Sequence, residues 1–119
     1  MSALSKFLRS QAGDRVAFWC PGCDESHSVG VGSGSGPRWN WNGDAEKPVF
    51  TPSVLVTGTD WLTDDEHARV MRGEHVEPRP TRCHTYVGCN GAQPGQIIFL
   101  SDCLHALAGK TVDLPEWPS

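Results

Sequence analysis

The feature that most constrains this chain is the segment Cys20-Pro21-Gly22-Cys23. A Pro-Gly dipeptide favours a tight turn, and a turn flanked by two cysteines places both thiols on the same side. Two thiolates in that arrangement can bind one metal ion, whereas a closed structural zinc site needs four ligands in a tetrahedron. The segment therefore predicts half of a zinc site, which other cysteines or histidines must complete.

The remaining ligands have to come from histidines and cysteines elsewhere in the chain. Cys83 and His84 are adjacent, and adjacent residues of a strand point to opposite faces, so only one of them should face the metal. Cys103 and His105 are two residues apart, which in a helix is a rotation of about 200°, so at most one of them is favoured. Thiolates suit a closed site best. We therefore predict the metal ligands Cys20, Cys23, Cys83 and Cys103, with His84, His105 and His27 as variants.

Other uses of the five cysteines remain open. No apolar signal segment is evident at the N-terminus, so metal or thiol chemistry is favoured over disulfides. The sequence after Cys23 lacks a helical pattern, which argues against a thioredoxin-type redox site. A catalytic zinc would keep an open position and use Asp102 or Glu25 as a base, but no HExxH motif is present. The cysteines could also be small buried apolar side chains.

Length and composition predict one small domain covering residues 1–119, with a helical and charged insertion at 60–82. The 13 glycines and 9 prolines indicate many turns and short elements, since both residue types exceed their average frequency. A net charge of −4 and a pI near 5.6 weigh against non-specific nucleic-acid binding. No apolar run reaches the ~18–20 residues of a membrane span, so a cytoplasmic protein is expected.

The pattern of apolar residues predicts a β-rich α+β fold, a small antiparallel sheet of hairpins with one or two short helices, stabilised by the zinc site. Pro52 lies inside one predicted strand and restricts it to a sheet edge or a bulge, or splits it into two strands. Thr63 and Glu66 form a capping-box pattern that starts a helix at 64–72, and Gly73 ends it. The predicted strands are 15–19, 26–31, 38–42, 48–58, 82–87 and 96–100, and further helices are predicted at 2–10 and 102–108.

Several aromatic and histidine residues have structural interpretations. Trp39 and Trp41 alternate with polar residues, so both should pack on one face of a strand. Trp61 and Trp117 are expected to anchor a helix and the C-terminal tail. His67 and His75 lie in the charged insertion and are expected to be exposed.

Four blocks carry a family resemblance: CPGC at 20–23, WNWNGDAEKPVFTPSVLV at 39–56, CHTY at 83–86 and FLSDCLHALAGKTVDLPEW at 99–117. They resemble a family of small proteins from tailed-phage and prophage genomes. Its members often carry the automatic label "ammonia monooxygenase", which this sequence does not support, because that enzyme is a membrane-embedded copper protein.

The chain is also distantly similar to a domain encoded beside bacterial ubiquitin-like conjugation genes. That likeness implies Cys20, Cys23 and Cys83 as metal ligands and leaves the fourth ligand open. Cys89 departs from the phage pattern and is interpreted as an additional thiol without a required role.

The resemblance implies a phage origin but no known activity. We predict a phage accessory protein of the host cytoplasm, a zinc-stabilised module that binds a host or phage protein through the loops at 32–36 and 60–80. The alternative is a zinc-dependent hydrolase with metal-activated water, and a virion component is a third possibility. No catalytic residue and no oligomeric state are assigned, an enzyme is not favoured, and neither a membrane nor nucleic acid is an expected partner.

Overall fold

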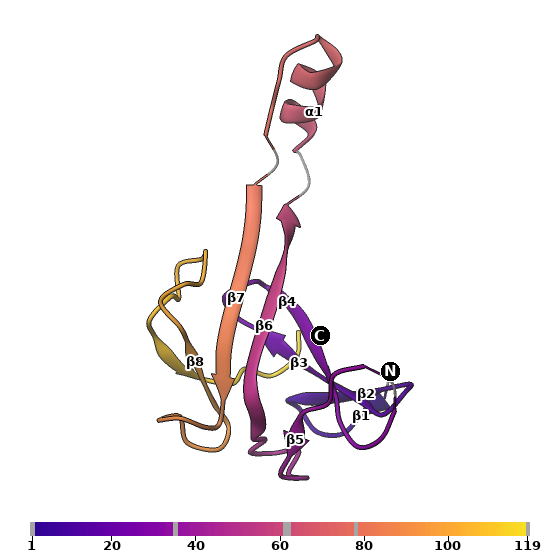
Figure 1. Cartoon of the computed structure of the whole chain (residues 1–119), viewed down its shortest axis with the longest axis vertical. Helices are drawn as coiled ribbons and strands as arrows, with labels where there is room; N and C mark the ends of the chain where they lie inside the picture. The colour runs from indigo at the N-terminus through magenta and orange to yellow at the C-terminus, as the bar shows by residue number, and fades with distance from the viewer. Residues whose placement is uncertain (1, 35, 61–62, 78, 119) are drawn as a thin grey trace.

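The computed structural model describes residues 2–34, 36–60, 63–77 and 79–118. These residues form two antiparallel sheets and one short helix, as Figure 1 shows. The predicted β-rich fold is therefore confirmed, with two sheets where a single one was expected. No helix in the described part of the chain is long and apolar enough to cross a membrane.

The first sheet contains the Pro-Gly turn. Its strands lie in the order β1-β2-β3-β4, and the predicted β3–β4 hairpin is confirmed. The turn closes with a hydrogen bond from the Asp24 N–H to the Cys20 carbonyl, with an N···O distance of 2.9 Å. The bounds are β1 Ser2–Ala3, β2 Leu8–Gln11, β3 Arg15–Cys20 and β4 Glu25–Gly30.

The helix predicted over 2–10 is wrong, because this segment forms β1, a turn and β2. The Ser5 hydroxyl accepts hydrogen bonds from the Phe7 and Leu8 N–H groups at 3.0 and 3.1 Å. Such side-chain bonds offer the backbone an alternative to a helix.

The second sheet carries the longest strands of the molecule, in the order β5-β6-β7-β8-β9. All four strands predicted in this half of the chain are confirmed, and the C-terminal tail adds a fifth by pairing with β8. The bounds are β5 Asn40–Trp41, β6 Phe50–Asp60, β7 Arg79–Val87, β8 Gln96–Phe99 and β9 Thr111–Asp113.

Pro52 lies in an irregular part of β6, and the bulge is the one of the three alternatives that the structure adopts. The register between β6 and β7 shifts between Phe50 and Val54, so residues 51–53 fall outside the regular ladder. A bulge of this kind redirects the side chains of the bulged strand. The bulge therefore determines the direction in which the Ser53 side chain points.

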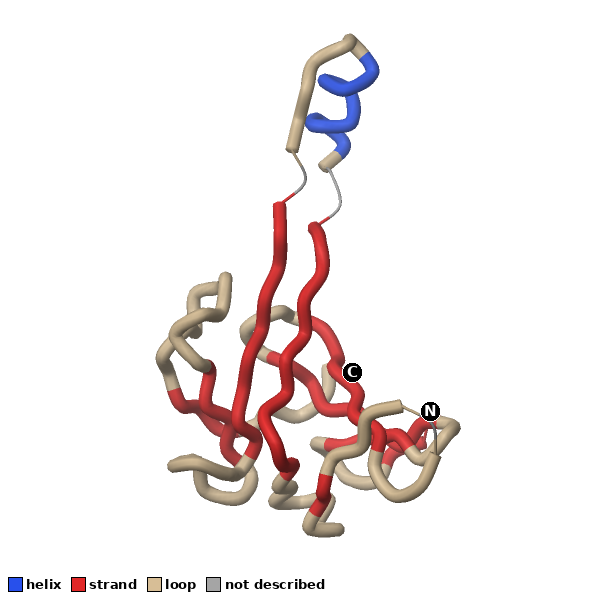
Figure 2. The backbone as a smooth tube through the Cα atoms, in the orientation of Figure 1, coloured by secondary structure: helices blue, strands red, loops and turns tan. Residues whose placement is uncertain are grey.

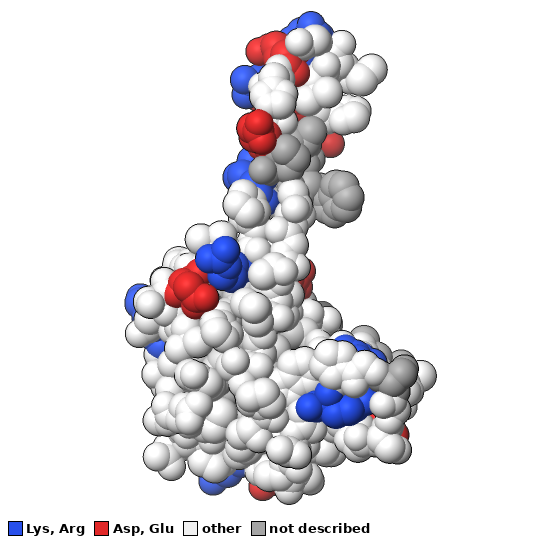
Figure 3. Space-filling model, in the orientation of Figure 1, with Lys and Arg blue, Asp and Glu red and all other residues white. Residues whose placement is uncertain are grey.

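Beyond the body, β6 and β7 continue as a two-stranded stalk that carries α1, Asp64–Met71 (Figures 1 and 2). The predicted helix and its capping box are confirmed, since the Thr63 side chain accepts from the Glu66 N–H and Glu66 bonds back to Thr63. None of the residues of α1 is buried. On the face seen in Figure 3, acidic and basic side chains are interspersed over this tip.

The core lies between the two sheets. Phe18 of the first sheet stacks on Phe50 of the second with a centroid distance of 6.1 Å. Trp39 and Trp41 are partly buried against this core, as predicted. Trp117 anchors the tail, because its indole N–H donates to the Phe7 carbonyl at 2.9 Å. The expectation for Trp61 lies outside the described residues.

The helix predicted over 102–108 is also wrong, because the segment is a series of turns. Its backbone bonds to β7 instead: the Leu100 N–H donates to the His84 carbonyl and the Leu104 N–H to the Arg82 carbonyl, both at 2.9 Å. The segment 100–104 therefore lies along the edge of β7 and forms an irregular extension of the sheet.

Candidate functional site

Consecutive residues of β7 serve two different clusters. Cys83 points into the space between the sheets and is almost fully buried. His84 points to the opposite face, where a quarter of its side chain is exposed (25%). The neighbouring segment repeats this alternation, with Asp102 on the side of His84 and Cys103 on the side of Cys83. The two faces of β7 therefore carry separate chemistry.

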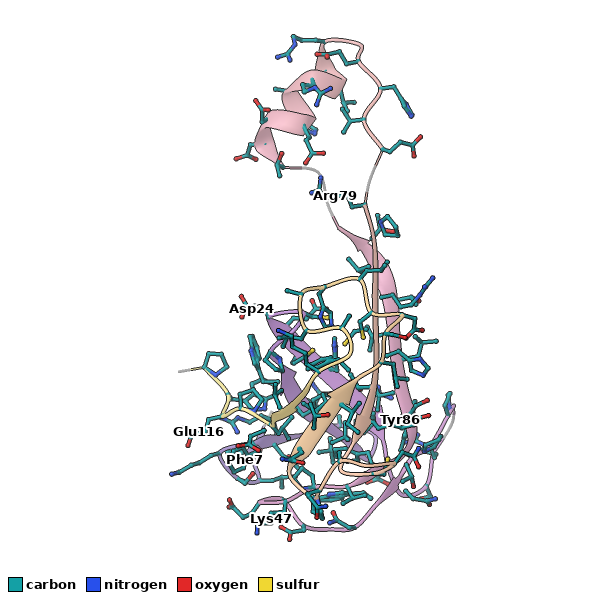
Figure 4. The ribbon with its side chains drawn as sticks, turned by 90° about the vertical axis from the view of Figure 1, so that its left-hand side faces the viewer. Phe7, Asp24, Lys47, Arg79, Tyr86 and Glu116 are labelled. Carbon is teal, nitrogen blue, oxygen red and sulfur yellow. The ribbon has the colours of Figure 1, made fainter. Side chains whose placement is uncertain are left out.

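The inner cluster brings together Cys20, Cys23, His27 and Cys83, whose possible ligand atoms all lie within 4.8 Å of one another. The Sγ atoms of Cys20 and Cys83 are 3.6 Å apart, although the two residues belong to different sheets. The Nε2 atom of His27 is buried and has no hydrogen-bond partner among the described residues. Three sulfurs and one imidazole nitrogen are a donor set that can hold a metal ion. Figure 4 shows sulfur atoms gathered inside the body beside the C-terminal segment.

A second group shares Cys83 and consists of Cys83, Cys103 and His105, again within 4.8 Å. The Nε2 atom of His105 is buried without a partner in the described structure. Its ring lies directly against Gly22, where a Cβ atom would overlap the ring. The glycine of the turn is therefore required for the His105 ring to approach the inner cluster.

The predicted ligand set is only partly assembled in one place. Cys20, Cys23 and Cys83 meet as expected, but His27 completes their group, whereas Cys103 joins Cys83 and His105. His84, a predicted variant ligand, points away from both groups. Cys89 lies outside them, with its Sγ 3.5 Å from the Phe50 carbonyl oxygen. Which of these side chains bind a metal stays a prediction.

The charges of the inner cluster are unequal. The hydrogen bond from the Cys83 thiol and the neighbouring His27 lower the pKa of Cys20 to about 4. Burial and the nearby Cys20 thiolate raise the pKa of Cys23 to about 12. The pKa of Cys83 is raised as well, because its thiol donates to Cys20 and is buried. The cluster thus holds one thiolate, and a bound cation would replace the protons of the other two thiols.

The outer face brings together three residues that sequence analysis did not combine. The Ser53 hydroxyl lies 3.0 Å from the Nε2 atom of His84, and the Nδ1 atom of His84 lies 3.2 Å from a carboxylate oxygen of Asp102. This chain of contacts is the geometry of a Ser-His-Asp triad, which is recognised by geometry and not by sequence position. Sequence analysis considered His84 only as a ligand and Asp102 only as a base for a metal, and gave Ser53 no role.

The triad is accessible from solvent, and a neighbouring side chain holds its backbone in place. The Asp102 side chain is 45% exposed, and Ser53 is half-buried. The Trp39 indole N–H donates to the Ser53 carbonyl at 3.1 Å and holds the backbone of the bulge. Asp102 can orient the imidazole, the imidazole can accept the proton of Ser53, and the hydroxyl can attack an acyl carbon.

Cys103 connects the two faces. Its Sγ atom accepts a hydrogen bond from the His84 N–H and donates one to the His84 carbonyl, both at 3.2 Å. The Cys103 thiol therefore binds both main-chain polar groups of His84, the central residue of the triad.

Comparison with known families finds one family, whose matched region ends before Asp102. The sequence profile of BubE, described as a bacterial ubiquitination-like system serine protease, matches residues 3–94. The matched region contains Ser53 and His84 and also the whole of the first inner group. No curated protein and no solved structure gives a significant match.

Proposed function

This chain belongs to the BubE family, and we propose that it is a serine hydrolase that cleaves an acyl bond in a protein of a bacterial ubiquitination-like system. The observation that carries the proposal is the contact chain Ser53–His84–Asp102 on the outer face of β6 and β7. The family match supports the same reaction class independently, because its description names a serine protease.

The proposed reaction uses all three side chains of the outer cluster. The Ser53 oxygen attacks the carbonyl carbon of the substrate while the Nε2 atom of His84 takes the hydroxyl proton. Collapse of the tetrahedral intermediate breaks the bond to the leaving group, which receives that proton from His84. Water then attacks the acyl ester on Ser53 with the same proton path, which releases the acid and restores the hydroxyl. Asp102 stabilises the imidazolium in both halves of the reaction.

The inner cluster supports zinc as a structural ion. The group of Cys20, Cys23, His27 and Cys83 offers four protein ligands with three sulfurs, which is typical of closed structural sites. A metal-activated water needs an open position, and the chain already has a serine nucleophile. The sequence also allowed a zinc-dependent hydrolase. Hydrolysis is kept in the present proposal, but the nucleophile is the Ser53 hydroxyl and not a metal-bound water.

The prediction of a phage accessory protein remains a proposal, supported by the four sequence blocks. In this proposal the host or phage protein that the module was expected to bind is the substrate of the hydrolase. The host cytoplasm would be the compartment in which they meet, and a virion component is the remaining alternative.

The first test is labelling of the purified protein with a fluorophosphonate, a reagent that reacts with activated serine hydroxyls. Mass spectrometry should locate the label on Ser53. Ser53→Ala should abolish labelling, and His84→Ala should slow it at least about 1,000-fold, since the triad acts as a unit. Ser10→Ala, on β2 outside the triad, is the matched control and should label normally. A folded wild-type protein that stays unlabelled contradicts the proposed function.

A further inference from the structure

The edge of β6 that follows Ser53 is open. On the side away from β7, β5 pairs with Phe50 and Thr51. From Val54 to Asp60 the strand pairs with β7 on its other side. Within the described chain no strand borders this part of β6 on the side of β5, and Figures 1 and 2 show it leaving the body.

The register identifies which main-chain groups face the open edge. His84 directs its N–H to the Cys103 sulfur and its carbonyl to the Leu100 N–H, so both point away from β6. Opposite residues of an antiparallel pair either bond to each other or both point outward. Leu55, the partner of His84, therefore directs its N–H and carbonyl to the open edge. The same holds for Thr57 and Thr59, which follow at two-residue spacing.

This edge lacks the usual protection. Natural proteins shield long exposed edges with charged residues, prolines or covering segments. Residues 54–59 are VLVTGT and contain neither a charge nor a proline. Leu55 is 55% exposed and lies on the same face as Ser53, two residues away and opposite His84. An apolar side chain and free main-chain groups are thus exposed beside the nucleophile.

We propose that an extended segment of the polypeptide substrate adds to β6 as a strand, pairs with Leu55, Thr57 and Thr59, and places its scissile bond at Ser53. This inference rests on the proposed function. Donors and acceptors repeated every two residues fit an extended polypeptide backbone. The Trp39 indole N–H already donates to the Ser53 carbonyl. The added strand therefore ends its pairing with β6 before Ser53. Leu55 contacts a substrate side chain and contributes to specificity.

A cavity of about 390 Å³ lies beside Cys23, His105 and Val56 and also borders the proposed strand site at Thr57 and Thr59. None of the three triad residues lines it.

The test compares two phosphonate probes, a diphenyl phosphonate of tetra-alanine and one of a single alanine. Both phosphonylate an activated serine, with the serine oxygen bonding to phosphorus and phenoxide leaving, but only the longer probe can form a strand. Thr57→Pro removes one edge N–H and leaves the ladder to β7 intact, since proline is tolerated on edge strands. Thr57→Val is the matched control, because it alters the side chain and keeps the N–H.

The wild type and Thr57→Val should react faster with the longer probe. Thr57→Pro should lose about 10-fold of that preference, which is the effect of one main-chain hydrogen bond left unmade. Equal preference in all three proteins would overturn the strand addition.

If neither probe labels Ser53, that result contradicts only the proposed function. A second measurement then tests strand addition without any reaction at Ser53. The Ser53→Ala protein, labelled with ¹⁵N, is titrated with acetyl-tetra-alanine amide. Strand addition should shift the amide signals of Leu55, Thr57 and Thr59. An absence of shifts at these three amides would contradict it.

Discussion

At the scale of single residues, the alternation of neighbouring side chains explains how a small domain carries two clusters. Cys83 and His84 are consecutive, as are Asp102 and Cys103, and each pair sends one side chain to each face of the second sheet. The hydrogen bonds between the Cys103 sulfur and the His84 backbone keep these two pairs in register.

We expect Cys103 to position His84 in the proposed triad. Cys103→Ala should lower kcat about 10-fold with little change in KM, because a small displacement of a catalytic group is costly. Cys103→Ser keeps a donor and an acceptor and should recover part of the loss. Cys89→Ala is the control, since that thiol lies outside both groups. Steady-state kinetics with a peptide ester gives both constants, and a rise in KM alone would contradict the positioning role.

The inner cluster leads to a separate prediction for the metal. Cys20→Ser should reduce the bound zinc measured by elemental analysis and lower the Tm, since metal binding to a closed site is coupled to folding. Cys89→Ser should match the wild type in both measurements. Tetrahedral cobalt bands rich in thiolate character are expected after exchange. Wild-type protein that folds with the same Tm in a strong chelator would contradict a structural metal.

Local chemistry determined how far the site could be predicted. The cysteines of the Pro-Gly turn and Cys83 were found because their spacing and residue type carry the signal themselves. Ser53 was missed because its role depends on the bulge at Pro52 and on the register that places His84 opposite Leu55. Pro52 indicates that a bulge is possible, but the strand register that brings His84 beside Ser53 is not written in a short motif.

At the scale of elements, α1 is the clearest success of the sequence analysis, because its signals are local. Thr63 and Glu66 cap the helix, and Arg79 of β7 donates to the Glu66 carboxylate at 2.9 and 3.0 Å. Figure 4 labels Arg79 at the foot of the tip. The helices expected at 2–10 and 102–108 failed because turn and cross-strand hydrogen bonds compete for the same backbone groups.

The tip should respond to acid. The hydrogen bond from Arg79, together with those from Thr63, holds the pKa of Glu66 below its ordinary value of 4.5. A lowered pKa in the folded state stabilises the fold above the unfolded value, and this contribution is lost as the pH falls below about 4.5. Amide exchange of α1 should therefore accelerate below that pH while the body stays protected. Glu66→Gln should abolish this pH dependence, and an unchanged profile would contradict the assignment.

At the scale of the whole molecule, the part that stabilises the fold is separate from the part that extends away from it. The core joins the two sheets through Phe18 and Phe50, whereas α1 lies at the end of a stalk with no buried residue. The fold class could be predicted from the excess of glycine and proline and from alternating strands. The division into two sheets could not, because it depends on long-range packing between segments that look alike in sequence.

This separation predicts opposite effects of two changes. Phe18→Ala should destabilise the protein by about 3–5 kcal/mol, as expected for a large core side chain. Replacing residues 63–77 by a short glycine-rich turn should leave the Tm of the body within a few degrees. Thermal and urea unfolding followed by circular dichroism measures both. A large loss of stability in the shortened protein would show that the tip contributes to the core.

The alternation at Cys83–His84 and Asp102–Cys103 also limits how this chain can change over generations. Substitutions at one site leave its neighbour in place, but losing or gaining a single residue just before either dipeptide reverses the directions of both side chains. Sulfur would then be displayed to solvent and imidazole or carboxylate turned into the interior, so both chemistries would be lost in one event. Lineages that keep both clusters must therefore accept length variation elsewhere, and the outer tip of the stalk is where it does least harm.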